Sequence, residues 1–232
     1  MRTAVLALVV SLLPSLALAA PAVVIKSTVS GLAVGAMVEE DQVIDVPAGA
    51  AVTLVTPGGK TVTRSGPFNG AAIGAGGGGD ASVARTISGF LSKKGGETRV
   101  GAVRAAGSRT AEDPDVIPVA ASGRYCAPPG GAPLWRGASD AEETYTLREV
   151  AGGSQAEVAF ARGAETAAWP ADVPLRDGGT YLVRVKGSVR SSRIVLAVAP
   201  GPVDNPAVRV AWMIDQGCTR QADLLIERLA GG

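Results

Sequence analysis

The sequence predicts a mainly β fold with a minor α part, and three features indicate it. Gly and Pro are abundant, with 31 and 15 residues among 232, and aromatic residues make up only 4% of the chain. Val and Thr recur in short alternating runs, which favours short strands joined by many turns. The length is that of one or two domains. We expect a small β module, a Gly-rich connector with one short helix, a β-sandwich and a C-terminal helical hairpin.

The start of the chain has the pattern of a secretory signal peptide. Arg2 supplies a positive charge, an apolar run covers residues 4–13, and residues 17–19 (Ala-Leu-Ala) offer the small-x-small pattern that a signal peptidase cuts. The apolar run is short for a bilayer span. We therefore expect residues 1–19 to be removed and the mature protein to be periplasmic or secreted and not membrane-spanning.

Residues 20–66 are predicted to form the small β module. Residues 51–55 and 60–64 alternate in polarity on either side of Pro57-Gly58-Gly59, which is typical of a β-hairpin. Apolar runs at residues 22–27 and 42–46 supply two further strands.

Residues 67–121 are predicted to be the connector. The tract Gly70–Gly79 is nearly all Gly and Ala and indicates a mobile loop. Asp80 can cap a helix that ends near Gly95, because the apolar residues that follow Asp80 share one helical face; these are Val83, Ile87, Phe90 and Leu91. A basic stretch at the end of this segment indicates a solvated connector rather than a polyanion site; it contains Lys93, Lys94, Arg99, Arg104 and Arg109.

Residues 122–200 return to β patterning and predict a sandwich. Strand-like runs occur at short, regular intervals with Gly turns between them; they are residues 145–150, 157–161, 180–186 and 193–198.

Residues 201–232 are predicted to form two short helices. Asn205 can cap the first, with Pro206 at its first helical position, and Gly217 can end it. Thr219 can cap the second, where apolar residues again recur with a helical period.

The two cysteines, Cys126 and Cys218, indicate a disulfide rather than two unrelated buried thiols, because an even pair in an exported chain is normally oxidised. The bond would close a loop of about 92 residues and stabilise the fold by about 4 to 5 kcal/mol. It would also attach the C-terminal hairpin to the start of the sandwich.

Composition excludes several classes of function. The 22 basic and 21 acidic residues nearly balance, so the chain lacks the basic footprint of a nucleic-acid-binding protein. It contains no His, which removes the usual Ser-His-Asp and Cys-His catalytic groups and the common zinc sites. The G-x-G-x-x-G match at Gly74–Gly79 lies inside the Gly/Ala tract, without the strand that a dinucleotide site needs. We therefore assign no catalytic, cofactor-binding or metal-binding residues.

Two further groups of side chains have a functional and a structural interpretation. Glu39-Glu40-Asp41 is the densest carboxylate cluster, as in a glycosidase or calcium site, but we expect a solvated turn. Trp135 and Trp169 are candidate ligand contacts that could form a sugar-stacking or peptide-binding platform, whereas packing inside the fold is the usual role of Trp.

The first module resembles the periplasmic FecR domain, the envelope-sensing part of regulators of iron-citrate uptake. The matching residues cover about 22–66 and comprise Gly31-Leu32-Ala33-Val34-Gly35, Val43 to Ala50, Val52 to Val55, the Gly58-Gly59 turn and Val62-Thr63. Unlike those regulators, the sequence has no transmembrane helix, so by this resemblance it would act as a partner of a sensor.

The second module resembles a fibronectin type III or immunoglobulin-like sandwich. The resemblance is carried by Trp135, by Tyr145-Thr146-Leu147 and by the run from Leu175 through Asp177-Gly178-Gly179 to Val185. It implies that Tyr181 is the tyrosine of a tyrosine corner.

Together these features predict an exported, non-enzymatic envelope protein that recognises another envelope protein or a cell-wall component. The alternatives are a carbohydrate-binding or carboxylate-based hydrolytic envelope enzyme, which clustered Trp side chains beside a carboxylate pair would favour, and a purely structural envelope protein.

Overall fold

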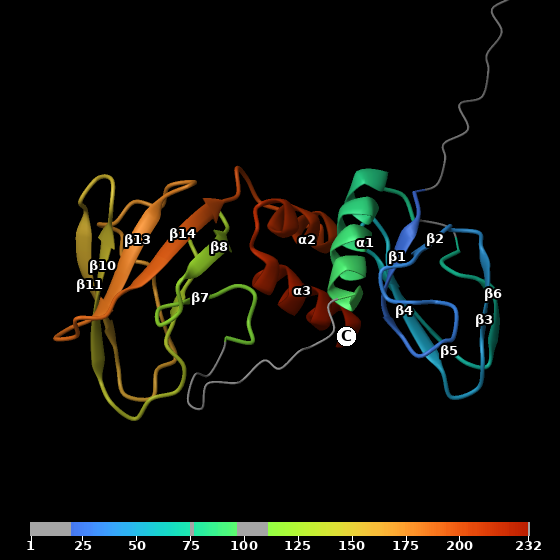
Figure 1. The fold of residues 1–232 in the computed structure, drawn as a ribbon, viewed down its shortest axis with the longest axis horizontal. Helices are drawn as coiled ribbons and strands as arrows, with labels where there is room; N and C mark the ends of the chain where they lie inside the picture. Colours follow the sequence, from blue (N-terminus) through green and yellow to red (C-terminus); the bar gives the residue numbers. More distant parts are fainter. Residues whose placement is uncertain (1–19, 75–76, 97–110, 232) are drawn as a thin grey trace, which may run out of the picture.

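The computed structural model describes residues 20–74, 77–96 and 111–231. The predicted signal peptide and the basic residues Arg99, Arg104 and Arg109 lie outside the described residues. As composition predicts, the described chain is mainly β, with three helices among these residues. Two β modules lie at opposite ends of the molecule, and the helices lie between them (Figure 1).

The first β module contains a four-stranded sheet in the order β2-β1-β4-β5 and a separate β3–β6 pair. The strands are β1 (Ala22–Ser27), β2 (Met37–Val38), β3 (Val43–Val46), β4 (Ala51–Val55), β5 (Thr61–Ser65) and β6 (Phe68–Ala71). The predicted hairpin is confirmed, since β4 and β5 pair antiparallel. Gly59 has a φ of +87° in its turn, a conformation that favours glycine.

The prediction of a mobile loop from Gly70 is wrong for the first four residues of that tract. Strand β6 pairs with β3 along its whole length, so the first module continues past residue 66. Ala72 and Ile73 are buried. The guanidinium of Arg64 donates hydrogen bonds to both of their carbonyl groups, at 3.0 and 3.1 Å. The neighbouring strand and Arg64 thus order a segment whose composition alone indicates disorder.

The helices are α1 (Ala81–Gly96), α2 (Pro206–Asp215) and α3 (Thr219–Gly231). The predicted caps of α1 and α2 are confirmed: Asp80 accepts the Ser82 N–H at 2.8 Å, and Asn205 accepts the N–H groups of Ala207 and Val208. Helix α3 differs, because Thr219 is its first helical residue and the Cys218 carbonyl already accepts the Ala222 N–H.

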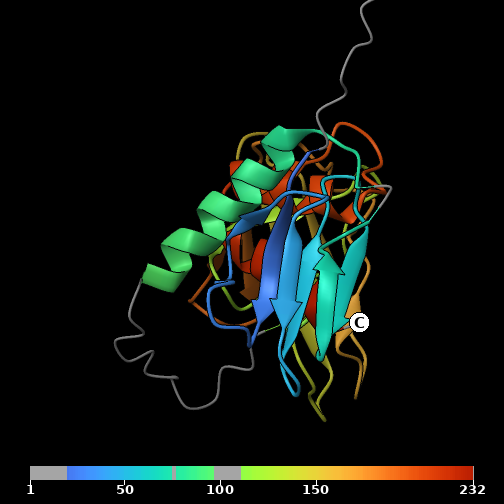
Figure 2. The same cartoon turned by 90° about the vertical axis from the view of Figure 1, so that its right-hand side faces the viewer.

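The three helices share one hydrophobic core with both β modules. The core joins side chains of α1, including Ile87 and Leu91, to the inner faces of α2 and α3. Val23 and Ile25 of β1 enter it from the first module, and Ala197 of β14 (Ser192–Val198) enters it from the second. Figure 2 shows α1 beside the strands of the first module. The segment predicted as a connector therefore supplies β6 and a central, partly buried helix.

The second β module consists of a five-stranded sheet in the order β11-β10-β13-β14-β8 and a three-stranded sheet in the order β12-β9-β7. Side chains of both sheets pack into one core, as in a sandwich. The remaining strands are β7 (Ile117–Pro118), β8 (Gly123–Ala127), β9 (Leu134–Trp135), β10 (Glu143–Glu149), β11 (Gln155–Phe160), β12 (Thr166–Ala167) and β13 (Thr180–Val185). Strand β8, which sequence patterning does not predict, pairs parallel to β14 at one edge of the larger sheet.

Tyr181 is fully buried in this core. Its hydroxyl donates to the Pro174 carbonyl at 2.7 Å and accepts the Arg176 N–H at 2.9 Å. These two hydrogen bonds fix the chain just before β13. The Trp169 ring lies edge-on to Tyr181, with the ring centroids 5.0 Å apart.

Candidate functional site

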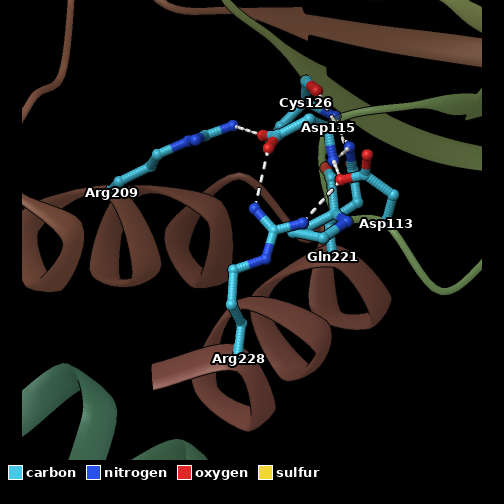
Figure 3. A network of polar contacts seen from close by, with 7 residues as sticks. Asp113, Asp115, Cys126, Arg209, Gln221 and Arg228 are labelled. Atoms are coloured by element: carbon cyan, nitrogen blue, oxygen red, sulfur yellow. Dashed lines mark hydrogen bonds and ion pairs between the residues drawn. The ribbon is translucent and has the colours of Figure 1, made fainter. Parts of the chain in front are cut away.

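The segment just before β7 is fastened to α2 and α3 by a network of ion pairs (Figure 3). Asp115 accepts hydrogen bonds from Arg209 of α2 and, at 3.0 Å, from Arg228 of α3. Arg228 also donates to Asp113 at 2.7 Å. Charges on three separate segments therefore hold the helices against the second module.

Gln221 of α3 makes the buried polar contact of this junction and is only 3% exposed. Its side-chain oxygen accepts the Cys126 N–H at 2.6 Å. Its side-chain nitrogen donates to the Cys126 carbonyl at 3.0 Å and to the Pro114 carbonyl at 2.7 Å. The amide thus takes the place that the peptide group of a further strand would occupy beside β8.

The predicted disulfide is confirmed. Cys126 and Cys218 are bonded, with their Cα atoms 5.9 Å apart, and both are buried. The bond links β8 to the turn between α2 and α3. The ion pairs, the Gln221 amide and the disulfide therefore form one junction, which we call the clasp.

The surrounding side chains lower the pKa of the Asp115 carboxyl. Burial on its own raises the pKa of Asp115, but hydrogen bonds from Arg209 and Arg228 outweigh burial and leave the pKa below its ordinary value. The same pairing raises the pKa of Arg228, chiefly through hydrogen bonds to Asp113 and Asp115. The charged form of the clasp is therefore the favoured one at neutral pH.

Asp115→Asn is expected to lower the free energy of unfolding by about 1 kcal/mol at pH 7, the scale of a partly exposed ion-pair network. Because the folded pKa of Asp115 is depressed, its stabilisation is complete above the unfolded value of about 3.9 and is lost as the pH falls through the folded value. Urea denaturation of both proteins between pH 7 and pH 2.5 should show the difference shrinking below about pH 4. A difference that stays constant over this range would contradict the assignment.

A cavity of about 640 Å³ opens beside the clasp, between the second module and the α2–α3 turn. Its walls come from the segment before β7, from β8 and β9, and from the start of α3. The chemically informative lining residues are Asp113, Arg124, Tyr125, Trp135, Arg220 and Gln221. This mixture of aromatic and polar groups in a concave surface is typical of a ligand site.

The tryptophans lie in different surroundings. Trp135 is half-buried and lines this cavity. Trp169 packs against the core of the second module and donates its indole N–H to the Val173 carbonyl at 2.7 Å. Trp212 lines a second cavity of about 330 Å³, which lies between α2 and the second module and is also lined by Asp115 and Cys126. Of the two candidate ligand contacts, Trp135 therefore has a place in a cavity and Trp169 has a packing role.

The carboxylate cluster lies in the turn between β2 and β3, within the first module, and lines neither cavity. Glu39 and Asp41 are exposed, as expected for a solvated turn. Glu40 is half-buried, and its carboxylate accepts the Gly77 N–H at 3.0 Å. The structure therefore gives Glu40 a role in holding the Gly-rich segment.

Among the described residues, no group of three or more His, Cys, Asp or Glu side chains is placed to hold a metal ion. No helix in the same part of the chain is both long and apolar enough to cross a membrane.

Sequence patterning does not reveal three residues of the site. Arg124 and Gln221 lie in a short strand and on a helix, where a single polar residue gives no signal. Arg136 is nearly fully buried, donates to the carbonyls of Ala161 and Ala164, and pairs with Glu143 at 3.1 Å. These contacts fix the position of Arg136, which lines the cavity beside Trp135.

No protein-family model matches the chain, and no curated protein matches it.

Proposed function

We propose that this chain is an exported envelope protein that recognises another envelope protein or a cell-wall component through the cavity beside the clasp. A FecR-like first module and an immunoglobulin-like second module belong to this proposal. The hydrogen bonds of Tyr181 support the second likeness. Positive φ angles at Gly31, Gly35 and Gly49 support the first, because they fall within the turns that carry the resemblance.

The observation that carries the proposal is a preformed cavity at a cross-linked junction. Trp135 and Tyr125 offer apolar area with few rotatable bonds, which makes aromatic side chains effective contacts. The disulfide and the buried Gln221 amide hold the walls before any ligand arrives, so little ordering is needed on binding. An intramolecular disulfide also fits the oxidising compartment to which residues 1–19 would direct the chain.

Trp135→Ala tests the proposal. Purified protein is titrated with soluble peptidoglycan fragments and, separately, is used to isolate partners from envelope extract by cross-linking. We expect the wild type to bind either a peptidoglycan fragment or a protein from the envelope extract. Binding should weaken at least about tenfold in Trp135→Ala, since a buried aromatic contact contributes more than about 1.4 kcal/mol.

Trp212→Ala is the matched control, because it removes the same side chain from the second cavity. Equal loss in both variants would contradict a site at Trp135. Hydrolysis of oligosaccharides by the wild type that disappears in Glu39→Ala, Glu40→Ala or Asp41→Ala would replace recognition with the hydrolytic alternative.

A further inference from the structure

One edge of the larger sheet is only partly covered. Strand β8 pairs with β14 on one side alone. Along an edge strand, residues alternate: the N–H and carbonyl of one residue point toward the neighbouring strand, and those of the next residue point outward. The N–H and carbonyl of Cys126 point outward, since both bond to the Gln221 side chain. The backbone groups of Arg124, two residues earlier, therefore point outward as well.

Gln221 covers the edge of β8 at Cys126 and leaves it open at Arg124. Among the described residues, Gln221 forms no hydrogen bond with Arg124. Arg124 is exposed and lines the 640 Å³ cavity. An open strand edge presents a donor and an acceptor to which another extended chain can pair. The volume lies within the range of about 300 to 1,000 Å³ that is usual for small-ligand sites.

The charges around the cavity favour an anion. Three arginines and one carboxylate, Asp113, contribute to its lining. Asp113 is paired with Arg228, and Arg136 is paired with Glu143. The Arg124 side chain passes over the α2–α3 turn, where a Cβ added to Gly217 would meet its Cδ at 3.4 Å. Among the described residues, Arg124 forms no ion pair, so its charge is available to a ligand.

We propose that the cavity binds the carboxyl-terminal end of an extended peptide. The peptide pairs with the outward N–H and carbonyl of Arg124 as an added strand. Its terminal carboxylate lies at the Arg124 guanidinium, and an apolar side chain packs on Trp135. This inference rests on the proposed function and adds the chemical class of the ligand.

The test uses two pools of N-acetylated tripeptides with apolar side chains, one with free carboxyl ends and one with amidated ends. Each pool is titrated into the full-length mature protein, and backbone amide and indole resonances are followed by NMR. We expect the free-carboxyl pool to shift the Arg124 amide and the Trp135 indole, and the amidated pool to bind at least about tenfold more weakly, because it lacks the charge.

Two variants separate the contacts. Arg124→Gln keeps the backbone and should abolish the difference between the pools. Arg124→Pro removes the outward N–H, which β14 does not use, and should weaken both pools, since proline is tolerated where an edge N–H faces solvent. Arg190→Gln, in the turn between β13 and β14, is the matched control and should change neither. If Arg124→Pro does not fold, a depsipeptide pool with an ester in place of the pairing amide tests the partner contact in wild-type protein, because it removes the peptide N–H that donates to the Arg124 carbonyl and should also bind more weakly.

Equal binding of the two pools, an unshifted Arg124 amide, or no binding at millimolar concentration would overturn the inference. The inference alone would fail, and the proposed function would stand, under one outcome. That outcome is a partner whose binding is weakened by Trp135→Ala but not by Arg124→Pro, and which the tripeptides do not displace. Tripeptide binding as expected, with no envelope partner or wall fragment bound, would instead contradict the proposed function.

Discussion

Replacing Cys126 and Cys218 together with Ala is expected to lower the free energy of unfolding by about 4 to 5 kcal/mol, the largest single effect in this protein. The bond closes a loop with a sequence separation of 92, and opening it releases the entropy of that loop in the unfolded chain. Urea denaturation under non-reducing conditions measures the difference between the two proteins.

The wild type in excess reductant is the control, and its unfolding curve should approach that of the double variant. Hydrogen exchange should rise first in β8 and in the segment before β7. Helices α2 and α3 stay packed on α1 and β1, because the apolar contacts between them do not depend on the disulfide. A stability loss below about 1 kcal/mol would show that the rest of the clasp suffices.

Gln221→Leu is expected to cost about 3 kcal/mol. The substitution keeps the side-chain size but leaves three backbone groups without partners: the N–H and carbonyl of Cys126 and the carbonyl of Pro114. Each buried, unpaired polar group costs about 1 to 3 kcal/mol, and the cost is partly offset because Leu is apolar. Urea denaturation again gives the value.

Gln216→Leu is the matched control, because Gln216 follows α2 and uses its backbone N–H, not its side chain, in the Trp212 carbonyl bond. It should change stability by less than about 0.5 kcal/mol. Equal effects of the two substitutions would contradict the role given to the Gln221 amide.

Local signals in the sequence suffice for the elements whose determinants lie close together along the chain. Asn205 and Pro206 specify the start of α2 because a cap needs only its next three residues. The hairpin around Gly59 follows from two adjacent runs and one turn. The disulfide is also predictable, since the chain contains only two cysteines.

The rest of the site depends on residues far apart in the sequence. Gln221 and Cys126 are 95 positions apart, and Gln221 and Pro114 are 107 apart. No periodicity marks a single amide on a helix as the partner of a strand edge. Strand β6 is missed for a related reason: Gly70 and Ala71 are poor strand formers, and they pair because β3 lies beside them.

The shared helical layer also sets an order for folding. The Asn205 side chain donates to the Pro57 carbonyl at 2.9 Å across 148 positions, and Lys26 reaches the Ala230 carbonyl across 204. Val23 and Ile25 are therefore covered only in part, by α1, until α3 has been synthesised as well. Contacts between residues so far apart in the sequence form slowly, and an exposed apolar face promotes aggregation until they have formed. For this chain, protection from aggregation during folding matters most at the face of β1.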